Sequence, residues 1–521
     1  MSRRVCAVRV SDHKNPNNFL WIYGFAAFSS VLLSAWIAYR ETVINPDAIC
    51  YLQSAAVIGA GGLRKAMNLC AQAQWPFYSV LIYFLGALTQ LPLLAAAYVW
   101  NAIFTAITVV SFIVLVRQLG GSRRVLWLAV FVILLAHQFN SIRQYIIRDH
   151  GFFAFYLVSL SLLLRYLSFP RWYYALGWGL SLLLATLFRI EGAVFLILLP
   201  WVFWFQSSMS YWQRTKGFLQ LNALSLSSGL LVFGWLIFHP EISLASLGRI
   251  QDLVFQVFHA GGVVWQRFQV SADAFARSVL TPESMQDAGL VFSLAILMWY
   301  LARVIMNLSF LYSALVVYGW WRRAFSFSRP AVSVLLGYIL INVLVTSLFL
   351  AQHLFLSKRY LIALTLILML WVPFALDRLI QSWQKKETPS WLMPLIVSLI
   401  ILASLGGIFD FGYSKAYLRQ AGDWLAERVP AAASLYSNDY QILYYSKHFG
   451  NDIFQKINEY HLPNATQQGY WKNYDYLALA VSKKNVAEKA ALLEAIPLLP
   501  IQVFSNKRGD QVLIYKIKDE T

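Results

Sequence analysis

Apolar segments long enough to cross a lipid bilayer recur along most of this chain, from Phe19 to Phe409. A helix needs about 20 consecutive apolar residues to cross the roughly 30 Å of hydrocarbon in a membrane. Of the 521 residues, 59% are hydrophobic and 13% are charged, and a single soluble core does not bury that much apolar surface. The sequence therefore predicts an α-helical polytopic membrane protein.

The apolar runs predict about eleven transmembrane spans. They lie near residues 19–39, 88–116, 124–140, 151–168, 172–188, 191–206, 217–238, 304–320, 331–353, 360–376 and 391–409. The first run is too long for a removable signal peptide and has no small-residue cleavage site, so we interpret it as a retained anchor.

The distribution of charge gives the orientation of these spans. Residues 1–409 contain 29 Lys or Arg and 12 Asp or Glu, and an excess of bases is typical of cytoplasmic loops. With a cytoplasmic N-terminus, every second loop should be basic. The segments that fit this alternation are RQLGGSRR (117–124), RYLSFPR (165–171), QRTK (213–216), WWRRAFSFSR (320–329) and DRLIQSWQKK (377–386). This excess therefore indicates membrane topology rather than nucleic-acid binding, and we expect a bacterial inner-membrane protein with a periplasmic C-terminus.

Three predicted outer loops, 40–90, 141–150 and 239–289, are candidates for function within a transmembrane domain of residues 1–409. The first contains two helical stretches, DAICYLQSAAVIGA and WPFYSVLIYFLGAL, whose apolar faces should lie along the membrane surface. The third has a looser amphipathic pattern and is expected to form a lid or wall.

Residues 410–521 differ in composition, with 13 Lys or Arg and 12 Asp or Glu. They combine a helical pattern at 415–429 with four strand-like runs, ASLYS, YLALAV, IQVFS and QVLIYKI. This pattern predicts a small extracytoplasmic α/β domain. Asp423, Asp439 and His448 are interpreted as surface or capping groups in that domain.

The cysteines leave one question open. Cys6, Cys50 and Cys70 are the only ones in the chain, and only Cys50 and Cys70 share the outer side. One disulfide between them and two free thiols are both compatible with the sequence, and the spacing is not that of a metal site.

Asp47 lies just past the first span, in a chain with few acids. Because it follows Asn45 and Pro46, it either caps a helix that starts at Ala48 or serves as a general base that takes a proton from a reacting hydroxyl at the membrane surface. The two roles are compatible with each other.

Asp149 is the second acid close to the end of a span on the outer side. With Arg143 and Arg148 nearby in sequence, it either forms an ion pair or caps a helix. The functional alternative is a second carboxylate that orients the acceptor or shares a metal ion with the adjacent His150, whose other interpretation is an ordinary hydrogen-bonding residue.

The preference of Lys and Arg for cytoplasmic loops does not explain the bases at the outer ends of spans. Arg189 and Glu191 lie in one outer turn, while Lys358 and Arg359 precede the tenth span. Arginine suits phosphate because its planar fork donates two parallel hydrogen bonds. The alternatives are an Arg189–Glu191 ion pair, and contact of Lys358 and Arg359 with lipid headgroups.

Together, an Asp after the first span, surface helices in the first outer loop, an Asp in the second and a soluble outer domain resemble the GT-C glycosyltransferases. Closer relatives would be the protein O-mannosyltransferases and the bacterial aminoarabinose transferase of lipid A. The resemblance covers the membrane part, most clearly residues 19–206, and SKRY at 357–360 is a further match.

The resemblance implies transfer of a hexose or pentose from a polyprenyl-phosphate donor to a lipid, glycan or protein acceptor on the periplasmic side. Asp47 matches the catalytic acid, and Asp149 matches the second-loop acid that binds the acceptor or a divalent cation. The donor phosphate would be neutralised by Arg189, Lys358 and Arg359.

The resemblance also suggests contacts and a metal. Tyr51, His150 and Glu191 are the expected contacts to sugar or acceptor, although Tyr51, like other interfacial aromatics, is also a typical membrane anchor. Many family members have a second acid directly after the first Asp, whereas Ala48 stands there in this chain. No cofactor is therefore assigned; should a divalent metal ion take part, Asp47, Asp149 and His150 are its candidate ligands.

Two other classes of function compete with this interpretation. A transporter or flippase of lipid-linked glycans would also contact phosphate, but it is expected to carry ionisable residues at mid-membrane, where the predicted spans have almost no acids. A non-catalytic partner of a polysaccharide polymerase, or a sensory anchor, would not need Asp47 and Asp149 on the same side as Arg189 and Arg359.

Overall fold

The computed structural model describes residues 19–206, 209–238, 249–409, 411–448, 469–484 and 496–518. Internal contacts divide the chain into two compact units. The bundle unit comprises residues 1–35, 101–143 and 148–409, and the sheet unit comprises residues 36–100, 144–147 and 410–521. Each unit is described by itself.

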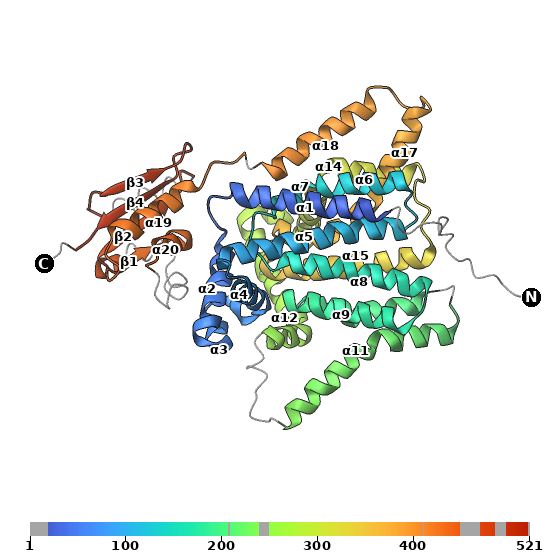
Figure 1. The fold of residues 1–521 in the computed structure, drawn as a ribbon, viewed down its shortest axis with the longest axis horizontal. Coiled ribbons are helices and arrows are strands. Elements are labelled where there is room, and N and C mark those ends of the chain that lie inside the picture. The colour runs from blue at the N-terminus through green and yellow to red at the C-terminus, as the bar shows by residue number, and fades with distance from the viewer. Residues whose placement is uncertain are drawn as a thin grey trace, which may run out of the picture. The chain divides into compact units, whose positions relative to one another are not determined.

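The bundle unit is built from helices (Figure 1). Its elements are α1 (Leu20–Arg40, as far as Ala35), α5 (Leu93–Gln118, from Asn101), α6 (Arg123–Leu134), α7 (His137–Ser141), α8 (Asp149–Ser168), α9 (Trp172–Phe188), α10 (Gly192–Leu198), η3 (Leu199–Phe205), α11 (Tyr211–Phe238), α12 (Arg249–Val279), η5 (Pro282–Asp287), α13 (Ala288–Leu308), α14 (Phe310–Trp321), α15 (Arg329–His353), η6 (Lys358–Leu361), α16 (Ile362–Leu368), η7 (Met369–Trp371), α17 (Val372–Gln384) and α18 (Leu392–Ile408).

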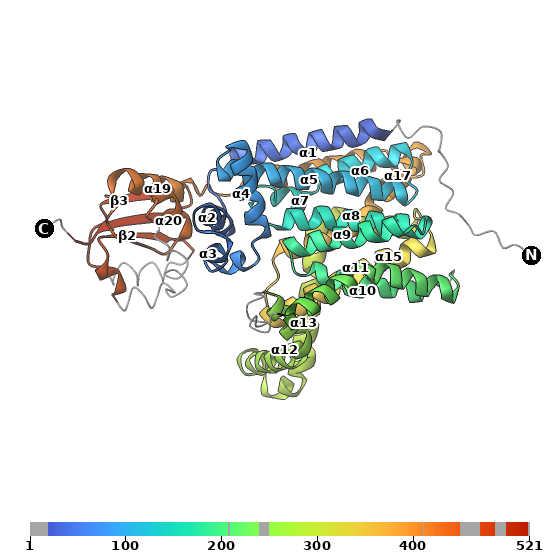
Figure 2. The ribbon, with the colours of Figure 1, turned by 60° about the horizontal axis from the view of Figure 1, so that its bottom comes forward.

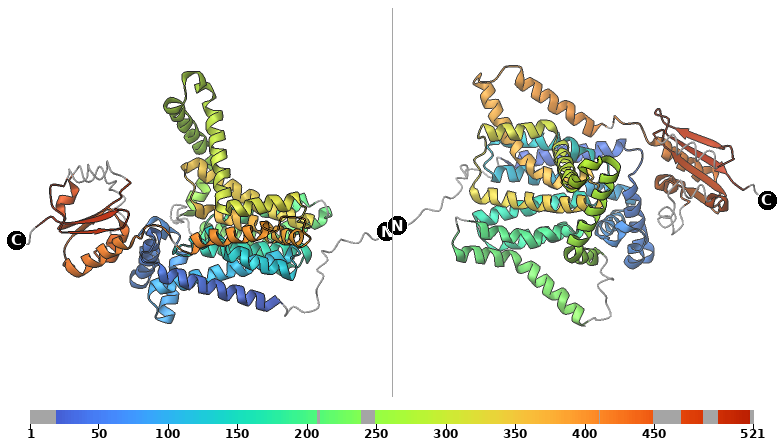
Figure 3. Two further views of the ribbon diagram at one scale, coloured as in Figure 1. Left: turned by 90° about the horizontal axis from the view of Figure 1, so that it is seen from above. Right: turned by 180° about the vertical axis from the view of Figure 1, so that it is seen from behind.

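Helices α8 and α9 lie side by side (Figure 2). Within the described part of the chain, their contact is the most extensive between any two helices. The hairpin of α12 and α13, drawn in green, projects from the rest of the bundle unit (Figure 3). Many large apolar side chains on the long helices are exposed, for example Phe28 at 62% and Leu340 at 65%. An outward apolar surface of this kind is what lipid covers.

Among the described residues, six helical segments are long and apolar enough to cross a membrane. They are Leu20–Arg40, Leu93–Gln118, Asp149–Ser168, Pro282–Leu308, Arg329–His353 and Lys358–Gln384. Five shorter apolar helices accompany them: Phe77–Thr89, Trp172–Phe188, Gly192–Phe205, Phe310–Trp321 and Leu392–Ile408. The polytopic helical fold is confirmed, whereas the count of about eleven spans stays a prediction.

Breaks in the helical structure divide the predicted spans at 124–140 and 304–320. The run at 124–140 is interrupted between α6 and α7, and the run at 304–320 is divided at Ser309, which has a φ of 75°. The Ser309 hydroxyl accepts a hydrogen bond from the backbone N–H of Tyr312 at 3.2 Å and so begins α14 as its N-cap. The helix before this break, α13, already starts at Ala288, at the end of the predicted third outer loop.

In the sheet unit, the first outer loop contains both predicted helices. Its elements are α2 (Pro46–Gly61), α3 (Leu63–Met67), η2 (Ala71–Gln74) and α4 (Phe77–Thr89). Helix α2 begins with Pro46 at its first position, where a missing N–H costs nothing. It ends at Gly61, and the C-cap residue Gly62 has a φ of 83°, which suits glycine.

The α/β character predicted for the C-terminal residues is also confirmed. Their elements are α19 (Ala416–Arg428), β1 (Leu435–Ser437), α20 (Tyr440–Ser446), η8 (Tyr470–Asn473), β2 (Tyr476–Val481), β3 (Gln502–Ser505) and β4 (Gln511–Lys516). The sheet has the order β1-β2-β4-β3; β1 and β2 pair in parallel, with Leu435 opposite Tyr476, and the other pairs are antiparallel.

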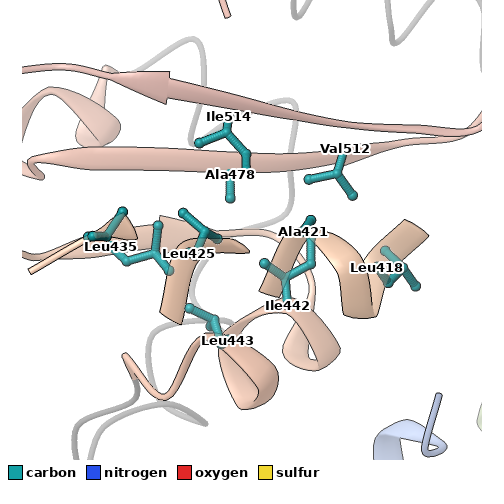
Figure 4. Close-up of a cluster of buried hydrophobic side chains, with 10 residues drawn as sticks. Leu418, Ala421, Leu425, Leu435, Ile442, Leu443, Ala478, Val512 and Ile514 are labelled. Carbon is teal, nitrogen blue, oxygen red and sulfur yellow. The ribbon is translucent and has the colours of Figure 1, made fainter. Parts of the chain in front are cut away.

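One face of this sheet packs against α19 and α20. Leu418, Ala421 and Leu425 recur at helical spacing and are buried on one side of α19. Figure 4 shows Leu425 and Ile442 turned toward Ala478 and Ile514 of the sheet. The strands thus have an apolar core of their own.

Candidate active site

Asp47 lies in the first turn of α2 and is half-buried. Asn45, not Asp47, is the N-cap residue, so the prediction that Asp47 caps a helix starting at Ala48 is wrong. Asp47 instead accepts a hydrogen bond through Oδ1 from Nε2 of Gln72 at 3.1 Å.

The segment before α2 is fixed by hydrogen bonds within the sheet unit. The side chain of Asn45 accepts from the backbone N–H of Ile146 at 2.8 Å and donates to its carbonyl at 3.3 Å. The backbone N–H of Ile44 donates to the hydroxyl of Tyr445 at 3.0 Å, and Gln441 donates to the carbonyl of Ile44 at 2.6 Å. Residues of the predicted second outer loop and of α20 thus hold the chain just before Asp47.

The structure resolves the open question about the cysteines. Cys50 and Cys70 form a disulfide with their Cα atoms 6.2 Å apart. Cys50 is one turn after Asp47 on α2, and Cys70 immediately precedes η2, which carries Gln72.

Tyr51 is 3% exposed and packs edge-on against Tyr78, with ring centroids 5.1 Å apart. The ring therefore belongs to the packing between α2 and α4. Its predicted contact with sugar or acceptor stays a prediction.

In the bundle unit, Asp149, Arg189 and Glu191 form one cluster. Nη1 of Arg189 pairs with Oδ1 of Asp149, and its Nη2 donates to Oε1 of Glu191 at 2.7 Å. The Asp149 and Arg189 side chains are 5% and 12% exposed. The chain brings them together because Asp149 begins α8, Arg189 directly follows α9 as its C-cap residue, and these helices pack against each other.

These contacts decide two of the alternatives. The Arg189–Glu191 ion pair is confirmed. The ion pair expected of Asp149 is also confirmed, but its partner is Arg189 and not a basic sequence neighbour such as Arg143. The buried Arg143 guanidinium donates instead to Asn140, Ser30 and Ser34. Arg148 lies close enough to act electrostatically on both carboxylates of the cluster.

Tyr360 joins this cluster to the SKRY segment. The Arg189 guanidinium lies over the Tyr360 ring at 4.9 Å from its centroid, and the Arg359 guanidinium lies 5.4 Å from the same centroid. Arg359 is also near enough to act on the charge of Asp149. Lys358 is exposed and Arg359 half-exposed, so both are accessible to a ligand.

The residues do not fit a metal site. Across the described ranges, no three His, Cys, Asp or Glu side chains come together as metal ligands would. The Asp149 carboxylate is already engaged by Arg189, and His150 is fully buried in α8. No step of a mechanism is therefore derived through a metal ion.

In the α/β domain, Asp439 and Asp423 have the structural roles expected from the sequence. Asp439 caps α20 by accepting from the backbone N–H groups of Gln441 and Ile442. Asp423 faces Arg419 one turn away on α19, at 3.5 Å. The His448 ring contacts backbone carbonyls.

Gln72 and Tyr360 are the residues that sequence reasoning missed. Gln72 lies in AQAQ, where nothing distinguishes one glutamine from the other. Tyr360 follows the two bases of SKRY, and an aromatic ring beside cations is a signal for cation–π contact.

No family model and no curated protein sequence matches this chain. Solved structures do match it. The archaeal oligosaccharyltransferase AglB from Archaeoglobus fulgidus, in complex with an inhibitory peptide and a dolichol-phosphate, has a TM-score of 0.56 at 13% identity, covering 92% of this chain and 71% of that one.

Two further solved structures match. The Archaeoglobus fulgidus oligosaccharyltransferase in complex with Zn and sulfate gives a TM-score of 0.52 at 15% identity, covering 94% of this chain and 72% of that one. ArnT from Cupriavidus metallidurans, bound to undecaprenyl phosphate, gives 0.43 at 12% identity, with 96% and 98% covered. The two oligosaccharyltransferase structures share their architecture with nearly the whole of this chain, which therefore has the fold of these oligosaccharyltransferases.

Proposed function

We propose that this protein is a membrane glycosyltransferase that moves a sugar from a polyprenyl-phosphate donor to an acceptor on the periplasmic side of a bacterial inner membrane. The observation that carries the proposal is the cluster at the ends of α8 and α9. There, a guanidinium held by two carboxylates shares the Tyr360 ring with Arg359, inside a bundle of GT-C fold.

Lys358 and Arg359 would bind the donor phosphate. A polyprenyl donor is insoluble, so its phosphate has to react at the membrane surface, where exposed bases at a helix start can reach it. As the bond between the sugar and the phosphate oxygen breaks, the leaving phosphate gains negative charge, and fixed cations stabilise that charge.

Arg189, also a predicted phosphate ligand, has its charge compensated by Asp149 and Glu191. In the proposal it holds these two carboxylates in place and packs over the Tyr360 ring. Its direct contact with the donor phosphate is part of the proposal. Asp149 and Glu191, with His150 and Tyr51, remain the proposed contacts to sugar or acceptor.

Asp47 would be the general base. The acceptor hydroxyl oxygen forms a bond to the anomeric carbon, the bond from that carbon to the phosphate oxygen breaks, and polyprenyl phosphate leaves with the electron pair. Asp47 takes the hydroxyl proton. The molecule that presents this hydroxyl is the acceptor, and a lipid, a glycan or a protein could each do so.

The fold supports this choice because AglB was solved with a dolichol-phosphate and an inhibitory peptide. A carrier lipid with a phosphate head and a separate acceptor are the two ligands that the proposal requires.

The test is native mass spectrometry of the protein purified in mild detergent, comparing wild type with Arg359→Ala. Wild type should carry a polyprenyl phosphate, with or without sugar, and the variant should be depleted of it. Lys385→Ala is the matched control, because this exposed cation follows the other end of the helical run that starts at Lys358. Equal occupancy in all three proteins would remove the phosphate role of Arg359.

A flippase of lipid-linked glycans would also retain the lipid. The second measurement is therefore transfer of the bound sugar to acceptors in a membrane extract. Retention of donor without any transfer would favour the transport function, and bulk phospholipid alone in wild type would contradict both.

A further inference from the structure

The loop that follows α2 is joined to α2 by two contacts at neighbouring positions. The Cys50–Cys70 disulfide is one of them, and the hydrogen bond from Gln72 to Asp47 is the other. Asp47 and Cys50 are three residues apart on a helix and therefore lie on the same face. Gln72 is two residues after Cys70.

The local backbone keeps Gln72 close to the disulfide. Cys70 is the N-cap residue of η2, and its carbonyl accepts from the N–H of Ala73 at 3.0 Å. Ala73 is fully buried, which fixes this turn against its surroundings. The position of the Gln72 amide therefore depends on where the disulfide holds Cys70.

We propose that Gln72, held by the Cys50–Cys70 disulfide, is a positioning residue for the Asp47 carboxylate. The inference deepens the proposed function, since it assumes that Asp47 is the base. The terminal torsion of an aspartate has broad minima, so a hydrogen bond to one carboxylate oxygen helps to fix the plane of the group. A general base works only within hydrogen-bond reach of the proton that it takes.

A chemical test needs no substrate. Full-length protein in mild detergent is treated with dicyclohexylcarbodiimide at one fixed pH, and labelling of Asp47 is quantified by peptide mass spectrometry. Gln72→Ala should raise the labelling severalfold, because a carboxylate without this hydrogen bond is a better nucleophile. Gln74→Ala is the matched control, since Gln74 is an exposed glutamine in the same short helix. Wild-type labelling in Gln72→Ala would overturn the proposal.

The role of the disulfide is tested by its coupling to Gln72. Reduction with a phosphine, or the double change Cys50→Ala with Cys70→Ala, should raise labelling in wild type to the level of Gln72→Ala. In the Gln72→Ala background the same treatment should have no further effect. Additive increases would show that the disulfide acts on Asp47 by another route and would overturn the coupling.

Turnover separates this inference from the proposed function. With undecaprenyl-phosphate glucose and undecaprenyl-phosphate arabinose as donor probes, Gln72→Ala should lower kcat by about tenfold and leave KM for the donor unchanged. A variant that raises KM with kcat unchanged would contradict a positioning role. If wild type uses neither donor while the labelling pattern holds, the hydrogen bond stands and the assigned reaction fails.

Discussion

Arg189 neutralises two carboxylates at once, and one of them is almost completely buried. Arg189→Ala should therefore destabilise the bundle unit by about 3 kcal/mol, because removal of one partner leaves a buried charge without compensation. Denaturant unfolding in detergent measures this loss.

Two further variants identify which carboxylate causes the loss of stability. Glu191→Gln should lose less, since the Glu191 side chain is 32% exposed, and Arg189→Ala combined with Asp149→Asn should recover most of the lost stability. If the single and double variants are equally unstable, the charge of Asp149 is not the cause.

Asp47→Asn should lower sugar transfer by about 100-fold or more, because asparagine does not accept a proton as a carboxylate does. Folding should survive, since the amide oxygen still accepts from Gln72. The exposed Asp423 on α19 provides the control Asp423→Asn, which should transfer at the wild-type rate. Normal transfer by Asp47→Asn would exclude Asp47 from the mechanism.

At the residue scale, the sequence was sufficient to predict a contact between residues that are close together in the chain. The Arg189–Glu191 pair could be predicted because charge beside apolar runs is costly and therefore unusual. The same argument singles out Asp47, whose role stays a prediction. The pairing of Asp149 with Arg189 could not be predicted, since it depends on how α8 packs against α9. Sequence neighbours instead suggested Arg143 and Arg148, and the first of these is buried among hydroxyl and amide groups.

At the element scale, α20 contacts the segment before α2 through side chains that saturate both backbone groups of Ile44. Ile44 is 3% exposed, so water would not easily replace a hydrogen bond that its backbone loses. Tyr445→Phe and Gln441→Ala should each cost about 1 kcal/mol and speed hydrogen exchange of residues 42–48.

Peptide-level exchange in the full chain measures this effect. The exposed Gln420 on α19 gives the control Gln420→Ala, for which exchange in residues 42–48 should not change. Unchanged exchange in both Tyr445→Phe and Gln441→Ala would mean that other contacts fix this segment.

The type of most elements was predictable, because helical and strand periodicities differ and the four strand-like runs are short. The breaks inside two apolar runs were not. Neither the sequence around Leu135 nor that around Ser309 contains the Gly or Pro that usually marks a break. At Ser309 the hydroxyl cap of α14 and a positive φ end one helix and begin the next.

At the scale of the whole molecule, acid should act on the α/β domain through its own carboxylates, and its two apolar clusters are built only from residues 417–517. Burial alone would raise the pKa of Asp510. Hydrogen bonds from the backbone of Lys483 and the side chains of Asn506 and Ser482 outweigh burial, so the pKa lies below its usual value.

A carboxyl group whose pKa is lower in the folded than in the unfolded protein stabilises the folded state. This contribution is complete above the unfolded pKa, near 3.9, and is lost as the pH falls through the folded pKa. Below about pH 5 the domain should therefore lose stability in wild type and less in Asp510→Asn. Exchange of β2 and β4 peptides, corrected for the intrinsic rate at each pH, checks this. Parallel acid curves for both proteins would exclude Asp510 as a source of the loss.

The grouping of segments was the least predictable feature of the molecule. Composition placed a boundary near residue 410, and contacts change unit there. The same contacts also group residues 410–521 with residues 36–100 and 144–147. Long-range hydrogen bonds such as that of Asn45 with Ile146 leave no local periodicity, so sequence patterns did not indicate the grouping.

The bonds to Ile44 also set an order of events during synthesis. Ile44 and Gln441 are 397 residues apart, and a ribosome that adds about 5 to 20 residues per second needs roughly 20 to 80 seconds to make the chain between them. The Cys50–Cys70 crosslink closes over a separation of only 20 residues and can form much earlier. An oxidoreductase acting on the emerging chain would thus shape the segment around Asp47 long before α20 exists to hold it.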